Sequence, residues 1–256
     1  MTIHPDKGYH HLLLTWLIFI GAVVFSLIVA WHQGVLELLY MGDKSKISWA
    51  ITLLFLLITA HVIRRVWVVS TQINAANEVS DFIRKQDNLM IRVIDDHVDI
   101  NGKSSLPPSY ATQYIHDLVT RYNNHAIVPD DIHQNNSDLI EVYESKLKGP
   151  HEIGWFVADV MIKLGLLGTI IGFILMLGSV VNVADFDVTT MQKILRHMSS
   201  GMGTALYTTM AGLVCSMLAS AQYHMLERYI DEMIENMKHL TQVHVMPRIH
   251  QGQETA

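Results

Sequence analysis

The sequence predicts an all-α membrane protein with four transmembrane helices and helical extensions on the cytoplasmic side. Three observations lead to this fold class. Half of the 256 residues are hydrophobic and only 16% are charged, whereas soluble domains average about a quarter of charged residues. The mean hydropathy is positive, at +0.25. Four separate segments are long and apolar enough to cross a hydrocarbon core, which takes about 20 residues.

The four apolar segments form two pairs along the chain. They are Leu12–Ala30, Ile47–Ile63, Leu164–Val181 and Met202–Ala221. Only Lys7 precedes the first segment and no A-x-A cleavage site follows it, so we expect a retained anchor and not a signal peptide.

The basic residues predict the orientation of these spans. With four crossings, 14 of the 18 Lys and Arg residues lie on one side of the membrane. Because cytoplasmic loops carry the excess of positive charge, we expect both termini and the 70–150 segment in the cytoplasm. The expected organisation is a two-span hairpin over 1–69, a cytoplasmic helical segment over 70–150, a second hairpin over 151–225, and a C-terminal helix and tail over 226–256.

Apolar residues at helical spacing predict the cytoplasmic elements. Their spacing continues from Arg65 to Val98, which predicts one helix up to the NGKSSLPPS turn at 101–109. A second helix is predicted over 109–125. The apolar stripe beyond the fourth span predicts that this helix continues to about Pro247 and packs on the 70–150 helices.

The third membrane helix is predicted to begin early, near the GPHEIGW segment, as a cytoplasmic extension. Asp159 and Lys163 lie four residues apart on it, which suits a helical ion pair. We expect this pair near the membrane surface.

The sequence lacks the motifs of several classes of enzyme and nucleotide-binding protein. The GKS triplet in NGKSS has His97 where a phosphate-binding loop needs glycine. Neither HExxH nor GxSxG occurs, and the histidines show no repeated ligand spacing. The single cysteine, Cys215, lies in an apolar segment. We therefore predict no enzymatic activity, catalytic residue, metal site or cofactor, and the absence of a basic run gives no reason to expect nucleic acid binding.

Small residues interrupt the third and fourth spans at helical spacing. In the third span they are Gly165, Gly168, Thr169, Gly172 and Ser179. In the fourth, one broad face carries Gly201, Thr204, Ala205, Thr208, Thr209, Gly212, Ser216, Ala219 and Ser220. Such faces allow membrane helices to approach closely, and a buried threonine can bond to its own helix. The same faces would also suit the lining of a narrow polar path.

Two sequence cores carry a resemblance to a known family. GLLGTIIGFILML in the third span and ALYTTMAGLVCSML in the fourth resemble the cores of the MotA/TolQ/ExbB channel family, the membrane subunits of ion-driven motors. The order of two spans, a cytoplasmic segment and two more spans looks like the flagellar-stator branch. Two features depart from the family pattern: the proline often found before the first core is absent, and Thr204 stands where ExbB-like chains carry glutamate.

The resemblance implies an oligomer and a partner. Such subunits form a pentamer in the bacterial inner membrane around two copies of a single-span MotB/ExbD/TolR-like subunit, whose membrane aspartate carries H⁺ or Na⁺. Thr169 and Thr209 match the channel-lining threonines of the family, and Thr208 and Thr204 lie beside them. The channel-forming hairpin would be 151–225. The hydroxyl groups would supply hydrogen bonds to the partner's carboxylate.

The charge pattern agrees with a partner that carries the ion. Leu164–Val181 and Met202–Ala221 contain no Asp, Glu, Lys, Arg or His, and an ion relay through a membrane needs titratable groups or a file of water. We therefore predict a channel or stator subunit that couples ion flow to mechanical work. A membrane scaffold for cytoplasmic proteins and a secondary transporter are the alternatives, although the two hairpins show no repeat of one another.

Overall fold

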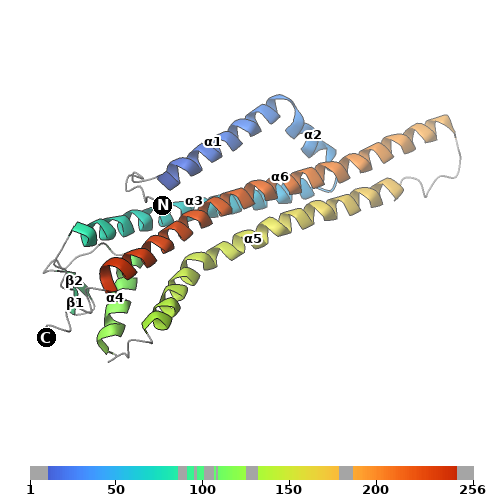
Figure 1. Ribbon diagram of the computed structural model, residues 1–256. Helices are drawn as coiled ribbons and strands as arrows, with labels where there is room; N and C mark the ends of the chain where they lie inside the picture. The colour runs from blue at the N-terminus through green and yellow to red at the C-terminus, as the bar shows by residue number, and fades with distance from the viewer. Residues whose placement is uncertain are drawn as a thin grey trace. The chain divides into compact units, whose positions relative to one another are not determined.

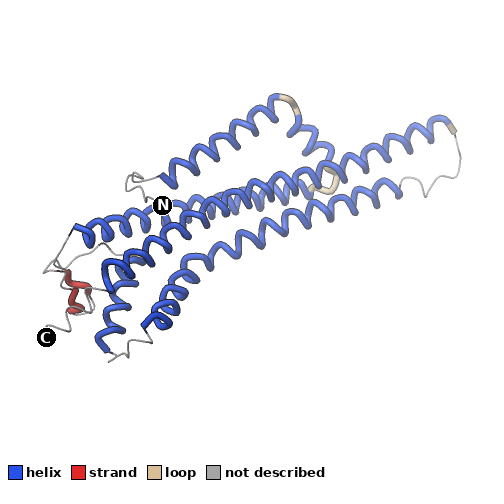
Figure 2. Tube along the Cα trace, in the orientation of Figure 1, coloured by secondary structure: helices blue, strands red, loops and turns tan. Residues whose placement is uncertain are grey.

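The computed structural model describes residues 11–85, 91–94, 97–100, 107, 109–124, 132–178 and 187–246. Nearly all of these residues are helical, so the predicted all-α class is confirmed (Figure 1, Figure 2). Four of the described helices are long and apolar enough to span a membrane, as predicted: α1 (His11–His32), α3 (Ile47–Lys85), α5 (Ile132–Gly178) and α6 (Val188–Leu240). Ser179, the NGKSS part of the predicted turn and the tail beyond 246 lie outside the described residues.

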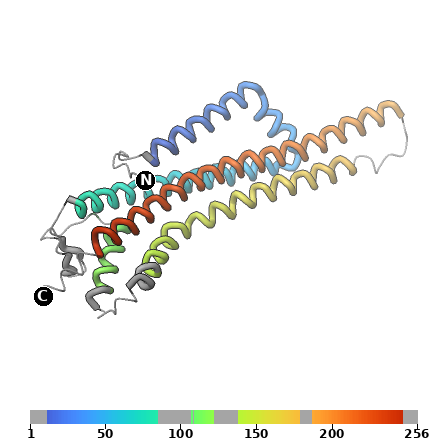
Figure 3. The backbone as a smooth tube through the Cα atoms, in the orientation of Figure 1, coloured from blue at the N-terminus to red at the C-terminus, as the bar shows by residue number. Residues whose placement is uncertain are grey.

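The chain divides into two compact units. Unit 1 comprises 1–13, 65–150 and 226–256, and unit 2 comprises 14–64 and 151–225. Helices α3, α5 and α6 contribute to both units, as the continuous tubes of Figure 3 show.

Unit 2 begins with α1 and a helix that the sequence did not predict. After α1 the chain turns at Gly34, whose φ of +73° favours glycine, and forms α2 (Val35–Gly42). Asp43 is buried and its carboxylate accepts from the backbone N–H of Ser45 and of Ser48, at 2.8 and 2.7 Å. This carboxylate caps the start of α3, because the first N–H groups of a helix have no helical partner.

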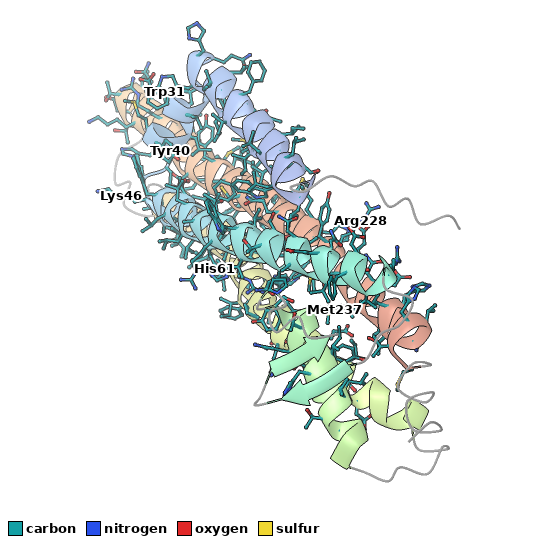
Figure 4. The ribbon with its side chains drawn as sticks, turned by 90° about the vertical axis from the view of Figure 1, so that its left-hand side faces the viewer. Trp31, Tyr40, Lys46, His61, Arg228 and Met237 are labelled. Carbon is teal, nitrogen blue, oxygen red and sulfur yellow. The ribbon has the colours of Figure 1, made fainter. Side chains whose placement is uncertain are left out.

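The surface of unit 2 is apolar in the manner of a membrane span. On α1, Leu17, Phe25 and Trp31 are 59%, 67% and 75% exposed. Trp31, Tyr40 and Lys46 lie toward one end of this unit and His61 toward the other (Figure 4). Aromatic and basic side chains at such an end suit a membrane–water interface.

Unit 1 contains a β-hairpin where the sequence predicted a helix. Helix α3 ends at Lys85, and β1 (Ile91–Ile94) pairs antiparallel with β2 (His97–Ile100). The prediction of helix as far as Val98 is therefore wrong. In the segments IRV (91–93) and HVDI (97–100), β-branched residues alternate with polar ones. A short apolar run of this kind fits both periods, and the alternation of period two prevails.

Helical segments of α1, α3, α4, α5 and α6, and a short π-helix at Thr241–Val245, form the rest of the described part of unit 1. The predicted second helix is confirmed as α4 (Tyr110–Asn124), which lies against both strands. Tyr143 of α5 donates to Asp117 of α4 at 2.6 Å. Burial raises the pKa of the Tyr143 hydroxyl, and the neighbouring Asp117 carboxylate raises it further.

An ion-pair cluster joins α5 to α6 in the same unit. Lys148 lies 2.7 Å from Glu144 and 2.8 Å from Asp231 of α6, and Lys238 lies 3.7 Å from Glu144. The contact confirms that the predicted continuation of the fourth span packs on the 70–150 helices. The hydrogen bond from Lys148 holds the pKa of the Glu144 carboxyl below its usual range.

The Glu144→Gln variant tests this cluster through its pH dependence. Because the folded state lowers the pKa of Glu144, its stabilising effect is present above the usual carboxyl pKa and is lost as the pH falls through the lowered value. Partly exposed pairs contribute about 0.5–1 kcal/mol, so we expect a small loss of unfolding temperature at pH 7 in detergent that shrinks at acidic pH. Glu141→Gln, on the exposed side of the same helix, is the control. An equal loss at both pH values would contradict the assignment.

Candidate functional site

The candidate site is the seam between α5 and α6 in unit 2. Gly165 lies against Gly212, Gly168 against Thr208, and Gly172 against Ala205 and Gly201. Residue numbers rise along α5 as they fall along α6, so the two helices run antiparallel and stay in contact over several turns (Figure 1).

Glycine is required at these contacts by the lack of space. A Cβ on Gly172 would lie 2.6 Å from the Ala205 nitrogen and 2.7 Å from the Gly201 carbonyl oxygen. A Cβ on Gly212 would lie 2.8 Å from the Met161 carbonyl oxygen. The stripe of small residues on each helix therefore forms a close packing face, as small-xxx-small patterns do in membranes. Ala205 and Ser216 are buried on the α6 side.

Thr204 and Thr208 are enclosed within the chain. Both side chains are 0% exposed. Thr208 donates to the carbonyl oxygen of Thr204 at 2.9 Å. Thr204 donates to the carbonyl oxygen of Gly42 at 3.0 Å and accepts from the N–H of Lys44 at 3.3 Å. These hydroxyl groups stabilise the helix and attach the α2–α3 loop to α6.

Thr169 and Thr209 are instead partly exposed. The Thr209 hydroxyl lies 3.2 Å from the Gly165 carbonyl oxygen and 3.1 Å from that of Ala205, and Thr169 donates to the Leu166 carbonyl oxygen at 2.5 Å. A hydroxyl has one hydrogen and two lone pairs. Since both hydrogens are bound to backbone carbonyls, these threonines present hydrogen-bond acceptors to their surroundings.

The two partly exposed threonines lie on the same side of the helix pair. Successive residues of an α-helix are rotated by about 100°. Around the axis of α5, Thr169 is rotated by about 40° from Gly165, which faces α6. Around the axis of α6, Thr209 is rotated by about 100° from Thr208, which faces α5. Both rotations run in the same direction when each helix is viewed from its N-terminus, and in two antiparallel helices this direction leads to the same side of the pair. We call Thr169 and Thr209 the threonine edge.

Thr204 lies on the other side of the seam. Thr204 lies four residues before Thr208 and is rotated from it by about 40° in the direction opposite to Thr209. Its side chain faces the α2–α3 loop, where it donates to the Gly42 carbonyl oxygen. The four threonines grouped in the sequence are therefore divided by the structure into an enclosed pair and an outward-facing pair.

The predicted ion pair between Asp159 and Lys163 is present on α5. Its place near the membrane surface stays a prediction. Gly154 lies against Tyr223 and Gly165 against Gly212, so counting between these contacts puts Asp159 level with Leu218.

A second contact relates this level to α3. Gln222 of α6 donates to Thr59 of α3 at 3.4 Å, and Gly42 just before α3 binds Thr204, so α3 and α6 run in the same direction. Leu218 precedes Gln222 by four residues and Phe55 precedes Thr59 by four residues, so Leu218 and Phe55 lie at the same level. The ion pair is therefore level with Leu218 on α6 and with Phe55 on α3.

Among the residues that the structure describes, no group of three His, Cys, Asp or Glu side chains could hold a metal ion. The segments 164–178 and 202–221 carry no charged side chain. The seam therefore offers hydroxyl and carbonyl oxygens as its polar groups.

The comparison with protein families decides the assignment. The MotA/TolQ/ExbB proton channel family matches residues 112–239, half of the chain. The chain belongs to the MotA/TolQ/ExbB proton channel family. The matched region contains all of α5, nearly all of α4 and α6, and the whole seam. The resemblance drawn from the two sequence cores is confirmed. The comparisons with curated proteins and with solved structures give no match.

Membership of this family and the four apolar helices make the chain a multi-pass membrane protein of a channel family. The sequence reasoning missed two parts of the site. The contact of Gly42 with the Tyr207 ring, which leaves a Cβ only 2.5 Å from that ring, has no sequence signal. The level of Asp159 relative to α3 and α6 could be found only once the helices were aligned.

Gly172→Ala tests the close approach of the helices, with Gly178→Ala as the matched control. The new methyl group at 172 meets backbone atoms of α6, whereas a Cβ at 178 meets nothing within 4 Å. Overpacking costs about 1–3 kcal/mol, so we expect Gly172→Ala to lower the unfolding temperature and the yield in detergent, and Gly178→Ala to change neither. Equal behaviour of the two variants would contradict the packing described here.

Proposed function

We propose that the chain is the channel subunit of an ion-driven motor and that the threonine edge lines its ion path. The observation that carries the proposal is the position of Thr169 and Thr209 on one outward-facing side of the matched helices, while Thr204 and Thr208 are enclosed. In this assignment the glycine seam fixes the helices and the threonine edge meets the ion.

The chemistry of the threonine edge limits what it binds. Its hydroxyl hydrogens are occupied by carbonyl oxygens, so its lone pairs face outward. A lone pair accepts from the O–H of a protonated carboxyl group or coordinates a cation, and it gives no hydrogen bond to a carboxylate. The edge therefore favours the ion-loaded form of a partner's carboxyl group, which revises the expectation that the hydroxyls bind the bare carboxylate.

The partner supplies the carboxyl group in this proposal. Five copies of the chain surround two copies of a single-span subunit of the MotB/ExbD/TolR type, whose membrane aspartate carries H⁺ or Na⁺ past the threonine edge. The resemblance to the family supports this stoichiometry, and the lack of charge along 164–178 and 202–221 agrees with it. Motion of the partner during ion transfer would deliver the mechanical work.

The location of the complex follows from the same reasoning. We place it in the bacterial inner membrane with both chain termini in the cytoplasm, because 14 of the 18 basic residues then lie on the cytoplasmic side. Unit 1 is then the cytoplasmic part and unit 2 the membrane part. The apolar surfaces of α1 and of the membrane part of α3 would contact lipid.

Thr169→Val and Thr209→Val test the threonine edge. Valine keeps the shape of threonine and removes the hydroxyl. A hydrogen bond between neutral groups contributes about 0.5–1.5 kcal/mol, and 1.4 kcal/mol corresponds to about tenfold in rate. We expect ion flux into vesicles, measured for the complex with its co-purified single-span subunit, to fall by up to about tenfold while the yield of complex is unchanged.

Thr208→Val is the matched control, since Thr208 is the direct neighbour of Thr209 but is enclosed and bonded to its own helix. Its flux should remain close to that of the wild type, and Thr209→Ser should keep more flux than Thr209→Val. Unchanged flux in Thr169→Val and Thr209→Val would return both residues to a packing role. It would favour a scaffold that does not conduct.

A further inference from the structure

The connector between the first two apolar helices is short and structured. Gln33 and Gly34 join α1 to α2, and residues 43–46 join α2 to α3. A chain covers at most about 3.6 Å per residue, so these links are too short to carry α2 far from the helices on either side. Since α1 and α3 are long and apolar enough to cross a membrane, α2 stays beside the ends of two spans.

The exposed side of α2 is largely apolar. Leu38 and Met41 are 59% and 77% exposed, whereas Leu39 is buried against the chain. Glu37 is exposed on the flank of this side and is rotated by about 100° from Leu38. A helix that turns apolar side chains outward, with a carboxylate on its flank, is suited to lie in the surface of a membrane with its apolar side against the acyl chains.

Tryptophan and lysine side chains surround α2. Trp31 at the end of α1 and Trp49 at the start of α3 are 75% and 59% exposed, and Lys46 is exposed between α2 and α3. Trp31, Tyr40 and Lys46 lie toward the same end of unit 2 (Figure 4). Tryptophan is enriched at the level of the lipid headgroups, and lysine is favoured there by anionic lipid. Lysine is depleted in protein–protein interfaces, so the combination favours lipid as the cover of α2.

The same connector is attached to α6. The Thr204 hydroxyl donates to the Gly42 carbonyl oxygen at 3.0 Å and accepts from the Lys44 N–H at 3.3 Å. The ring of Tyr207, three residues further along α6, lies against Gly42. Hydrogen bonds to backbone atoms and a ring contact therefore join the end of α2 to α6, and a displacement of α2 acts directly on that helix.

We propose that α2 is a membrane-surface anchor for α6. Leu38 and Met41 insert between the acyl chains, Glu37 faces water, and the two flanking tryptophans lie among the headgroups. The hydrogen bonds of Thr204 pass the level of α2 on to α6, and with it to the α5–α6 seam. This role involves no ion path, so it is independent of the proposed function.

Single cysteines in a Cys215→Ser chain test the insertion. The variants Leu38→Cys, Met41→Cys and Glu37→Cys replace exposed side chains and carry a nitroxide label in vesicles of phosphatidylcholine and phosphatidylglycerol. Collisions of the label with oxygen, which dissolves in lipid, are compared with collisions with a water-soluble nickel chelate. We expect the label at 38 to lose most of its nickel collisions relative to the label at 37 and to keep its oxygen collisions. The label at 41 should be intermediate.

Two results would overturn the insertion. Equal nickel collisions in Leu38→Cys and Glu37→Cys would place the exposed side of α2 in water. Loss of both nickel and oxygen collisions in Leu38→Cys would show that protein covers this side, as in a contact between copies of the chain.

The attachment to α6 is measured separately through Thr204→Val. Nitroxides on Glu37→Cys and Gln192→Cys report the distance between α2 and α6 by pulsed electron paramagnetic resonance, in labelled chain diluted with unlabelled chain. Thr204→Val should broaden the distance distribution, and Thr204→Ser, which keeps the hydroxyl, should restore it. Thr208→Val is the matched control, since that hydroxyl donates within its own helix. An unchanged distribution in Thr204→Val would overturn the attachment.

Discussion

The close approach of α5 and α6 is the constraint on which the rest of unit 2 depends. Where Gly172 meets Ala205 and where Gly165 meets Gly212, there is no space for another carbon atom. Lipid provides no hydrophobic force that would press two apolar helices together, so the contact relies on van der Waals packing along the small faces. This contact fixes both the rotation of each helix and its level relative to the other.

Once the rotation is fixed, the roles of the threonines are separated. Residues that point into the seam or toward the α2–α3 loop are enclosed. The hydroxyl groups of Thr204 and Thr208 donate to backbone carbonyl oxygens of the same chain. Thr169 and Thr209 are left on the outward side with their lone pairs available. The same packing therefore leaves an acceptor-lined edge on one outward-facing side of the helix pair.

The fold was largely predictable from sequence because hydrophobic length is a strong signal in membrane proteins. The start of α3 at Ile47 and the glycine stripe of α5 follow directly from the residues. The hairpin at 91–100 did not, since a short run of β-branched residues fits two periods and its contact with α4 decides between them. Helix α2 was missed because its eight residues between two spans give little pattern of their own.

The candidate site was predictable as a set of residues but not as an arrangement. The recurrence of small residues identified the correct faces, and the two sequence cores identified the family. Spacing along one helix cannot show which threonine faces the neighbouring helix, because that depends on the rotation set by the seam. It also cannot give the level of Asp159 relative to α3 and α6, which follows from contacts between the three helices.

The reactivity of single cysteines tests most directly whether the threonine edge faces an ion path. Cysteine would be placed in turn at Thr169, Thr209, Thr208 and Phe25 of a Cys215→Ser chain, and the assembled complex in vesicles would be treated with a small cationic thiol reagent. The account predicts that Thr169→Cys and Thr209→Cys react, whereas the enclosed Thr208→Cys and the lipid-facing Phe25→Cys do not. If Thr169→Cys and Thr209→Cys were as unreactive as Phe25→Cys, the threonine edge would not line a water-accessible path.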